Sequence, residues 1–374
     1  MTITKISIRQ MDGILMYFVV LQYEDMDIRN RIQTFIETGR ILASYPVPQA
    51  NGIPHPLSEP ALRAGALNPW FTPDNIRFAL NSLGRSMQEV KMNRWLEGYY
   101  AALENPKRRE KIIGVVTAGN IPLAGFHDFL CVLVCGHIFH GRLSGQDNVL
   151  LPAIAGILEG LDPEWNRMIR FFDQPLKDID AIIATGSDNT YRYFEYYFSR
   201  FPHIIRKNRN GIAIIHGNET DAELEGLASD IMLYFGLGCR SVSKLYIPAG
   251  FDVMQLMPFF RPWEDVIRHN KYFNNYEYQK SIRIVNKQPF YDFGNLLLAE
   301  ESKLSSAVSV LNFERYISKS GLMEALPALS DKIQCVVSAA DPGLPFISPG
   351  TAQKPELWDY ADDTDTLSFL LEEI

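Results

Sequence analysis

The stretch Lys111-Ile-Ile-Gly-Val-Val-Thr-Ala-Gly-Asn-Ile-Pro122 begins the part of the chain that decides the fold. Its first seven residues form an apolar, β-rich run, and a helical pattern follows at residues 123–135. The alternation continues with strand-like runs at 137–143 and 181–184 and a helical pattern at 148–161. Strands that alternate with helices in this way predict parallel βαβ units and an α/β fold.

Ligands of such sheets bind outside the carboxyl ends of the strands, so residues that leave those ends are the first candidates for a site. Asn120 follows the first predicted strand. Its side-chain amide can donate to an oxyanion, and removing one such donor typically costs on the order of 3 kcal/mol of transition-state stabilisation. The alternative is a turn residue that bonds its own backbone.

Two further strand ends carry groups suited to a nucleotide. Gly186 and Ser187 precede a predicted helix, where exposed N–H groups favour an anion. Arg142 and Ser144 end another strand, and the planar fork of an arginine matches the 2′-phosphate of an adenosine ribose. A solvated arginine and an ordinary Gly-Ser turn are the alternatives, and no G-x-G-x-x-G fingerprint is present.

Cys239 lies in a second α/β region, in the stretch Tyr234-Phe-Gly-Leu-Gly-Cys-Arg-Ser241. A capping-box sequence, Thr220-Asp-Ala-Glu223, opens a helix whose apolar face extends to Tyr234. A strand is predicted at 242–247. A thiol in the connection between a helix and a strand, next to glycines, can contact both a substrate and a backbone N–H. An acyl-accepting nucleophile requires both contacts. The alternative is a small buried hydrophobe.

Glu300 and Glu301 precede a β-rich run at 307–313. Either carboxylate can bond a ribose hydroxyl, and an ordinary exposed acidic pair is the alternative. The seven histidines show no metal-ligand spacing such as H-E-x-x-H, so no metal site is predicted.

Composition narrows the class of protein. The chain has 374 residues, 47% of them hydrophobic, and a net charge of −8. A chain of this size can bury a large core, and the acidic balance argues against nucleic acid or an anionic membrane as the main partner. The four cysteines form no C-x-x-C pair, and no apolar run resembles a signal peptide or a membrane span. We therefore expect a soluble, cytoplasmic protein without disulfides.

Changes of pattern divide the chain into four parts. Residues 1–110 are predicted to form a mainly helical segment that packs on the cofactor domain, with a helix start at Thr72-Pro73. Residues 111–206 would form a dinucleotide-binding domain, and residues 207–345 a catalytic domain with the cysteine nucleophile. Residues 346–374 are predicted to form a C-terminal tail.

The order of these features is more specific than any one of them. The series resembles the aldehyde dehydrogenase superfamily, and more closely the bacterial acyl-CoA reductase family typified by LuxC, the fatty acid reductase subunit of bioluminescence. The likeness runs from about residue 60 to the C-terminus. It is carried by Gly114-Val-Val-Thr-Ala-Gly-Asn-Ile-Pro122, Gly186-Ser187, Lys207-Asn-Arg-Asn-Gly-Ile-Ala213, Gly238-Cys-Arg-Ser-Val-Ser-Lys-Leu-Tyr246 and Ala352-Gln-Lys-Pro-Glu-Leu-Trp-Asp-Tyr360, continuing to Asp365-Thr366.

The resemblance implies an aldehyde-dehydrogenase-like fold, with a Rossmann-type parallel-sheet cofactor domain and an α/β catalytic domain. In that fold Cys239 would be the nucleophile, and Asn120 with the Cys239 backbone N–H would form the oxyanion site. The implied reaction is NADPH-dependent reduction of a fatty acyl thioester, such as an acyl-CoA, to the aldehyde through an S-acyl-cysteine.

The resemblance also implies a cofactor site. Gly186 and Ser187 would lie near the pyrophosphate, Arg142 near the adenosine end, and Glu301 near the nicotinamide ribose, where Glu300 would serve nearly as well. Arg142 stands where a lysine is usual in the superfamily, so NADPH is expected, with NADH as the alternative.

One departure from the aldehyde-oxidising relatives bears on the direction of the reaction. Those relatives carry a glutamate upstream of the cysteine, which activates water to release the acid. The matching neighbourhood here reads Ile204-Ile-Arg-Lys-Asn208 and contains no carboxylate. An acyl-enzyme without a base for water persists long enough for hydride delivery, which favours reduction to the aldehyde.

Three alternatives remain open. The protein could be an aldehyde dehydrogenase that runs in the oxidative direction, or a reductase of acyl phosphates, or a non-catalytic subunit that docks an acyl-transfer partner. The expected partners are an acyl thioester, an acyl-transferring protein and a second copy of the chain, since a homo-oligomer is expected.

Overall fold

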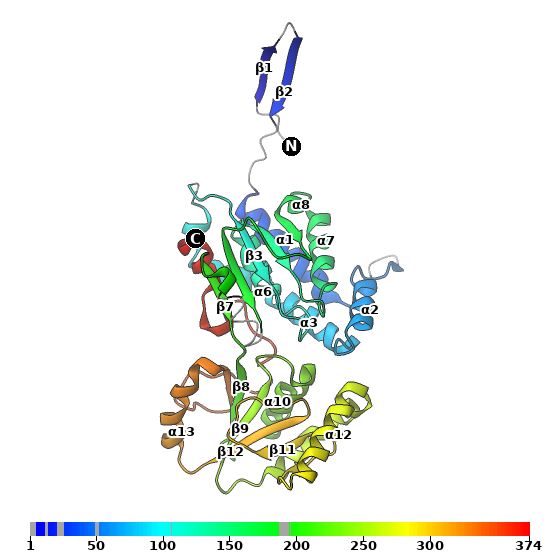
Figure 1. The fold of residues 1–374 in the computed structure, drawn as a ribbon, viewed down its shortest axis with the longest axis vertical. Helices are drawn as coiled ribbons and strands as arrows, with labels where there is room; N and C mark the ends of the chain where they lie inside the picture. The colour runs from blue at the N-terminus through cyan, green and yellow to red at the C-terminus, as the bar shows by residue number, and fades with distance from the viewer. Residues whose placement is uncertain are drawn as a thin grey trace.

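The structure is a computed structural model, and it describes residues 5–11, 14–20, 26–48, 52–105, 107–186, 194 and 196–374. Two sheets lie one above the other in Figure 1, each covered by helices. A separate antiparallel hairpin, β1 (Lys5–Met11) and β2 (Ile14–Val20), projects from the N-terminal end. Among the described residues, no helix has the length and apolar character needed to cross a membrane.

The first sheet has five parallel strands in the order β5-β4-β3-β6-β7. Counted along the chain, this is the order 3-2-1-4-5 of dinucleotide-binding sheets. The strands are β3 (Ile112–Val116), β4 (Ile138–Arg142), β5 (Ile169–Phe171), β6 (Ala181–Thr185) and β7 (His203–Arg206). The connecting helices include α6 (Phe126–Val134), α7 (Leu150–Leu161) and α8 (Trp165–Met168). The predicted parallel sheet is confirmed.

The N-terminal helices share a core with this sheet. They are α1 (Ile28–Ser44), α2 (Ser58–Leu67), α3 (Pro73–Ser86), α4 (Glu89–Leu96) and α5 (Tyr100–Leu103). The ring of Phe35 meets Phe129 of α6 and Trp165 of α8 edge to face, and all three are buried. Thr72 caps α3 by accepting from the Asn75 N–H at 3.2 Å, as its sequence predicts.

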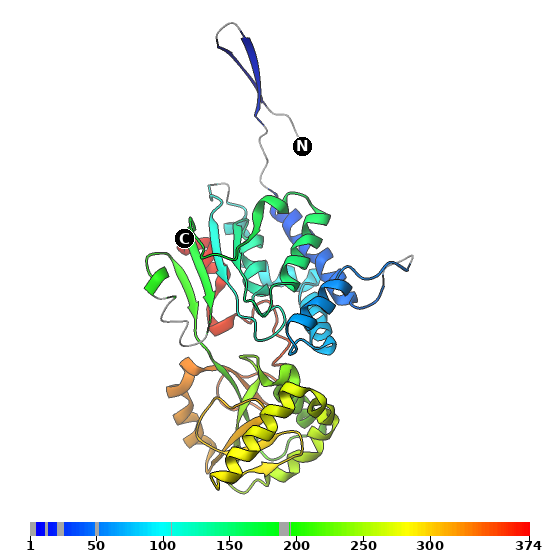
Figure 2. The same cartoon turned by 45° about the vertical axis from the view of Figure 1, so that its right-hand side comes forward.

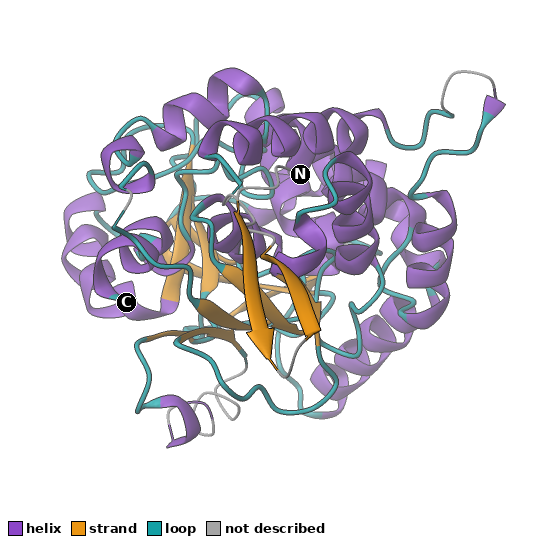
Figure 3. Ribbon diagram, turned by 90° about the horizontal axis from the view of Figure 1, so that it is seen from above, coloured by secondary structure: helices purple, strands orange, loops and turns teal. Residues whose placement is uncertain are grey.

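The second sheet has six strands in the order β10-β11-β12-β9-β8-β13, and only β10 runs antiparallel to its neighbour. They are β8 (Asn210–Ile214), β9 (Val242–Pro248), β10 (Tyr291–Asp292), β11 (Leu297–Glu300), β12 (Val310–Tyr316) and β13 (Ile333–Ser338). The helices α10 (Asp221–Met232), α11 (Met257–Phe260), α12 (Asn270–Val285) and α13 (Lys319–Ala325) cover its faces (Figure 2). Seen from above, the strands lie inside the molecule with helices around them (Figure 3).

The C-terminal segment, residues 346–374, leaves the second sheet and returns to the first unit, where it ends with α14 (Thr366–Ser368) and one π-helical turn (Figure 1). Long-range hydrogen bonds hold it there. The Trp95 indole donates to the Tyr360 hydroxyl at 2.8 Å, and His137 Nε2 lies 3.0 Å from the Leu370 carbonyl oxygen. The segment therefore contacts both units.

Candidate active site

The two sheets meet end to end. Strand β7 ends at Arg206, and only residues 207–209 separate it from the start of β8. The carboxyl ends of the first sheet thus face the amino ends of the second, with β7 above β8 in Figure 1. Asn120 follows β3 and Cys239 precedes β9, so both belong to this junction.

Asn120 and the Cys239 loop are joined directly. The Asn120 side-chain nitrogen donates to the Leu237 carbonyl at 2.6 Å, two residues before the cysteine. An amide NH2 carries two donors, so a second N–H of Asn120 is available for another acceptor. The Cys239 side chain is exposed. The structure therefore brings these two predicted residues to one place from positions far apart in the sequence.

The backbone turns sharply before the cysteine. Tyr234, Phe235 and Gly236 are all left-handed, with φ of 54°, 58° and 72°. Two successive non-glycine residues in this region carry strain that the surrounding packing must offset. The Phe235 ring supplies part of that packing, because it lies 5.0 Å from Trp70 and 4.6 Å from His269 between ring centres.

This turn corrects the predicted helix. The capping box of Thr220 and Glu223 is present, but α10 ends at Met232. Tyr234 was expected on the apolar face of the helix and instead lies in the left-handed turn, where it is buried against Phe78. The aromatic contacts override the helical periodicity at this point.

The residues after Cys239 are also held. The Ser241 hydroxyl accepts from the Gly238 N–H at 3.2 Å, and the Gln353 side chain donates to the same oxygen at 2.9 Å. Arg240 Nε donates to the Ala352 carbonyl at 2.7 Å. The sequence analysis placed no site residue in the C-terminal segment, although it quoted these residues for their family likeness.

The charge environment of Cys239 is mixed. Solvent reaches the side chain, yet many protein atoms surround it, and this desolvation raises the pKa of the thiol. The guanidinium groups of Arg240 and Arg206 oppose that rise, whereas the carboxylate of Asp362 adds to it. Asp362 was missed by the sequence analysis, since nothing in its local sequence indicates that it lies near the cysteine.

Arg206 lies in the stretch Ile204-Ile-Arg-Lys-Asn208, which contains no carboxylate. Its side chain is buried, and it donates to Asp128 at 2.6 Å and to the Thr366 hydroxyl at 3.0 Å. The ion pair with Asp128 raises the pKa of Arg206 against the effect of burial. A fixed cation therefore stands at the end of β7, next to the junction.

Three of the predicted cofactor residues, Arg142, Ser144 and Gly186, lie at the carboxyl edge of the first sheet. Arg142 ends β4 and is exposed, and Gly186 directly follows β6. Ser144 packs on the loop of Asn120, because a Cβ at Gly119 would lie 2.5 Å from the Ser144 hydroxyl oxygen. Ser187 lies outside the described residues.

This edge suits a dinucleotide. The strand order reverses between β3 and β6, and dinucleotides bind at such a switch point. An arginine at the end of the second strand, β4, is placed to meet the adenosine end. Arg142 and Gly186 end or follow the two strands that flank β3, so the residues present fit a nicotinamide nucleotide. The contacts of Arg142 with the adenosine end and of Gly186 with the pyrophosphate stay predictions.

The Glu301 carboxylate is held by an ion pair within the second unit. Glu301 follows β11 at the carboxyl edge of the second sheet, and its carboxylate pairs with Arg283 at 2.8 Å. Glu300 pairs in register with Phe313, which pairs with Leu245. Leu245 is three residues past the start of β9, or about 10 Å along the strand. The role of Glu301, and of Glu300 in its place, stays a prediction.

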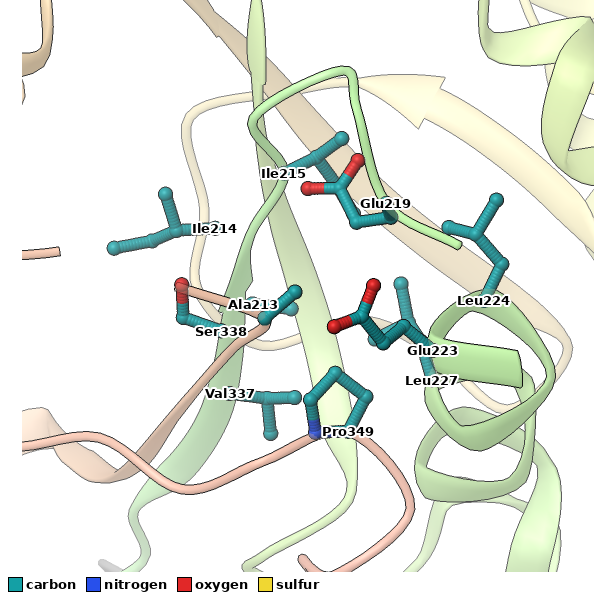
Figure 4. Close-up of a pocket in the computed structure, with 11 residues that line it drawn as sticks. Ala213, Ile214, Ile215, Glu219, Glu223, Leu224, Leu227, Val337, Ser338 and Pro349 are labelled. Atoms are coloured by element: carbon teal, nitrogen blue, oxygen red, sulfur yellow. The ribbon is translucent and has the colours of Figure 1, made fainter. Parts of the chain in front are cut away.

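A surface cavity lies at the carboxyl edge of the second sheet, between the ends of β8 and β13 and the start of α10 (Figure 4). Its polar lining is already engaged. Glu219 accepts from the Gly217 N–H at 3.0 Å, and Glu223 accepts from the Thr220 N–H at 2.7 Å. Within the described ranges, no group of three or more His, Cys, Asp or Glu side chains is arranged to hold a metal ion.

Comparison with solved structures identifies the fold. The chain superposes on an indole-3-acetaldehyde dehydrogenase, AldA of P. syringae, bound to NAD+ and IAA, with a TM-score of 0.56, 11% identity, and coverage of 84% of this chain and 72% of that one. Aldehyde dehydrogenase C of Pseudomonas syringae, bound to NAD+ and octanal, gives a TM-score of 0.58 at 9% identity with the same coverage. The aldehyde dehydrogenase KauB of Pseudomonas aeruginosa gives 0.56 at 13% identity, again with 84% and 72% covered.

The fold is aldehyde-dehydrogenase-like. This confirms the predicted combination of a Rossmann-type parallel sheet and a second α/β unit. No protein-family model matches the sequence, and neither does any curated protein.

Proposed function

We propose that the protein is an acyl-CoA reductase of the LuxC type, which converts a fatty acyl thioester to the aldehyde through an S-acyl intermediate on Cys239. The main support is the position of the exposed Cys239 thiol. It lies at the amino edge of the second sheet, and Asn120 of the nucleotide-binding edge bonds its loop. A nucleophile and a hydride donor can meet only at such a junction.

The chemistry of the chain's own residues follows from this arrangement. The Cys239 sulfur adds to the thioester carbonyl carbon, the bond from that carbon to the CoA sulfur breaks, and the thiol proton leaves with CoA. A bound nicotinamide nucleotide supplies the hydride. The second amide N–H of Asn120 and the Cys239 backbone N–H stabilise the thiohemiacetal oxyanion. Its collapse breaks the carbon–sulfur bond, frees the aldehyde and returns the thiolate, which takes a proton from solvent.

Arg206 supports reduction over hydrolysis. A carboxylate at the end of β7 could take a proton from water and release an acid, but a guanidinium cannot act as a base. Its bonds to Asp128 and Thr366 also fix it in a buried position. The acyl group on Cys239 is then left for the hydride.

An aromatic cluster supports an apolar acyl chain. Tyr234 packs edge to face on Phe78 at 5.9 Å, and the half-buried side chains of Ile121 and Trp263 pack on the same cluster. Ile121 follows Asn120, and its terminal methyl would lie 3.7 Å from a Cβ at Gly238. An apolar surface thus borders both catalytic residues. It suits a hydrocarbon chain better than the small, charged substrates of acyl phosphate reductases.

NADPH is the proposed cofactor, with NADH as the alternative. Its support is the exposed Arg142 at the end of β4. The Arg142→Ala variant should lose binding to NADPH by tenfold or more while its binding to NADH changes little, as measured by nucleotide fluorescence. Equal losses for both nucleotides would exclude contact with the 2′-phosphate.

Intact mass spectrometry tests the nucleophile. Mixing the protein with a long-chain acyl-CoA in the absence of NADPH should add one acyl mass, and peptide mapping should place it on Cys239. The Cys239→Ala variant should gain no acyl mass and form no aldehyde. Cys335→Ala is the matched control, because Cys335 is a half-buried thiol on β13, and it should label fully. Aldehyde formation by the Cys239→Ala variant would refute the assignment.

A second assay separates the reductive direction from the alternatives. The aldehyde with NADP+ should be consumed only when CoA is present to accept the acyl group. Oxidation to the acid without CoA would identify an aldehyde dehydrogenase. Failure to bind either nucleotide would identify a non-catalytic acyl-transfer subunit. An acyl-transferring partner protein, a homo-oligomer and a cytoplasmic location complete the proposal.

A further inference from the structure

We propose that the C-terminal segment, residues 346–374, positions the nucleophile, and that Gln353 is the positioning residue, acting through the Ser241 hydroxyl. The proposal rests on the role proposed above for Cys239. It assigns a function to a stretch that the chemistry of acyl transfer does not itself require.

The turn that carries Cys239 is closed by Ser241. The Ser241 N–H donates to the Gly238 carbonyl at 3.0 Å, and the Gly238 N–H donates to the Ser241 hydroxyl oxygen at 3.2 Å. These two bonds form a ring around Cys239 and Arg240. The direction of the thiol therefore depends on where the Ser241 hydroxyl is held.

Gln353 holds that hydroxyl. Its side-chain nitrogen donates to the Ser241 oxygen at 2.9 Å, and both side chains are buried. The Gln353 amide oxygen would lie only 3.5 Å from a Cβ at Gly238, so the amide rests on the turn itself. A donor fixed in a buried place can orient a hydroxyl far better than water can.

The backbone next to Gln353 is itself held by hydrogen bonds. The buried carboxylate of Asp230, on α10, accepts from the N–H groups of Gly350 and Ala352 at 2.7 and 3.0 Å. The Ala352 carbonyl accepts from Arg240 Nε at 2.7 Å. The residues just before Gln353 and the residue just after Cys239 thus form one connected unit.

The far part of the segment is fixed to the other unit of the protein. Thr366 accepts from Arg206 at 3.0 Å, and the Tyr360 hydroxyl accepts from the Trp95 indole at 2.8 Å. The same segment therefore bonds to the turn of Cys239 through Gln353 and to the first unit through its later residues. Since Asn120 belongs to that first unit, the segment sets the position of the thiol relative to its oxyanion donor.

The test uses the full chain and the variants Gln353→Leu and Ser241→Ala. Each should slow S-acylation of Cys239 by acyl-CoA tenfold or more at saturating acyl-CoA, with a KM within about twofold of the wild type. The double variant should be no slower than the slower single variant, because both changes break the same contact. Lys91→Ala is the control. It removes the half-exposed ion pair of Lys91 with Glu356 (2.6 Å), which lies away from the turn and is only one of several bonds between the segment and the first unit, so this variant should acylate at the wild-type rate.

A second readout does not depend on the proposed reaction. The rate of Cys239 alkylation by iodoacetamide is measured as a function of pH. The midpoint of this pH profile should shift in the same direction in Gln353→Leu and Ser241→Ala, and it should not shift in Lys91→Ala. Thermal unfolding within about 3 °C of the wild type would show that the variants are folded, and Gln353→Glu replaces Gln353→Leu if that variant does not fold. A wild-type alkylation profile in the folded Gln353 variant would overturn the positioning role. A wild type that alkylates but never acylates would refute only the proposed function.

Discussion

Asp147 is a buried carboxylate beneath the Asn120 loop, and removing its charge should stabilise the protein. One of its oxygens accepts from the Leu123 N–H at 2.6 Å, and the other has no hydrogen-bond partner. Leu123 is left-handed, with φ of 61°, so this bond holds a strained turn three residues past Asn120. Burial raises the pKa of Asp147 from 3.8 to about 7, against the lowering effect of the Leu123 N–H.

The sign of the pH dependence follows from that direction. Between pH 3.8 and about 7 the folded protein keeps a proton on Asp147 that the unfolded chain releases. The free energy of unfolding therefore falls as the pH rises through this window and is flat above it. At about 1.4 kcal/mol for each pH unit, the loss amounts to about 4 kcal/mol in all, of which about 3 kcal/mol lies above pH 5.

The Asp147→Asn variant keeps an oxygen for the Leu123 N–H but cannot ionise. The free energy of unfolding of the variant minus that of the wild type, measured by urea unfolding, should rise by about 3 kcal/mol from pH 5 to pH 8. Comparing two pH values cancels any fixed cost of the new amide group. Asp180→Asn is the matched control, because exposed Asp180 also accepts a backbone N–H, from Ile112 at 2.7 Å. An equal gain in both variants, or none in Asp147→Asn, would refute the argument.

Three further outcomes are expected. Arg206→Met should lower the free energy of unfolding by about 3–5 kcal/mol in urea titrations, because it leaves the Asp128 carboxylate buried and unpaired. Gly119→Ala should weaken nucleotide binding by fluorescence titration, since its Cβ would lie 2.5 Å from the Ser144 hydroxyl, and adding Ser144→Gly should restore most of the loss. Phe78→Ala should lower kcat/KM at least tenfold for long-chain acyl-CoA and less than threefold for acetyl-CoA, because only the long chain reaches the aromatic cluster.

The elements that the sequence predicts well are those set by local interactions. The alternation that begins at residue 111 produces the parallel sheet, because each apolar run forms a strand and each amphipathic run packs a helix on it. The caps at Thr72 and Thr220 depend on hydrogen bonds that span three residues. The meeting of Asn120 with the Cys239 loop was expected only from the family resemblance. It arises because Asn120 follows β3 and Cys239 precedes β9, at strand ends that face each other.

The elements that the sequence does not predict depend on distant contacts. Tyr234 and Phe235 fit a helical period, but the rings of Phe78, Trp70 and His269 hold them in a left-handed turn instead. Asp362 acts on Cys239 only because the C-terminal segment passes the junction on its return.

The position of Glu301 depends on a connection rather than on a motif. Residues 301–309 join the carboxyl end of β11 to the amino end of β12, so they must cross the height of the sheet. Lys244 is fully buried and donates to the Glu301 carbonyl, and Asn312 donates to the carbonyl of Ser305 at 3.0 Å. These bonds fix the backbone of the connection, which local spacing alone could not reveal.

The C-terminal segment also bears on the proposed lack of a base for water at the end of β7. Arg206 needs a buried counter-charge, which Asp128 supplies, and a second acceptor, which Thr366 of the segment supplies. A glutamate at position 206 would instead place two carboxylates together in a buried site, where one of them must stay protonated. Restoring a base for water therefore requires a change at Asp128 as well. Under the proposed function, the residues that secure the segment would thus also keep water from competing with hydride for an acyl group on Cys239.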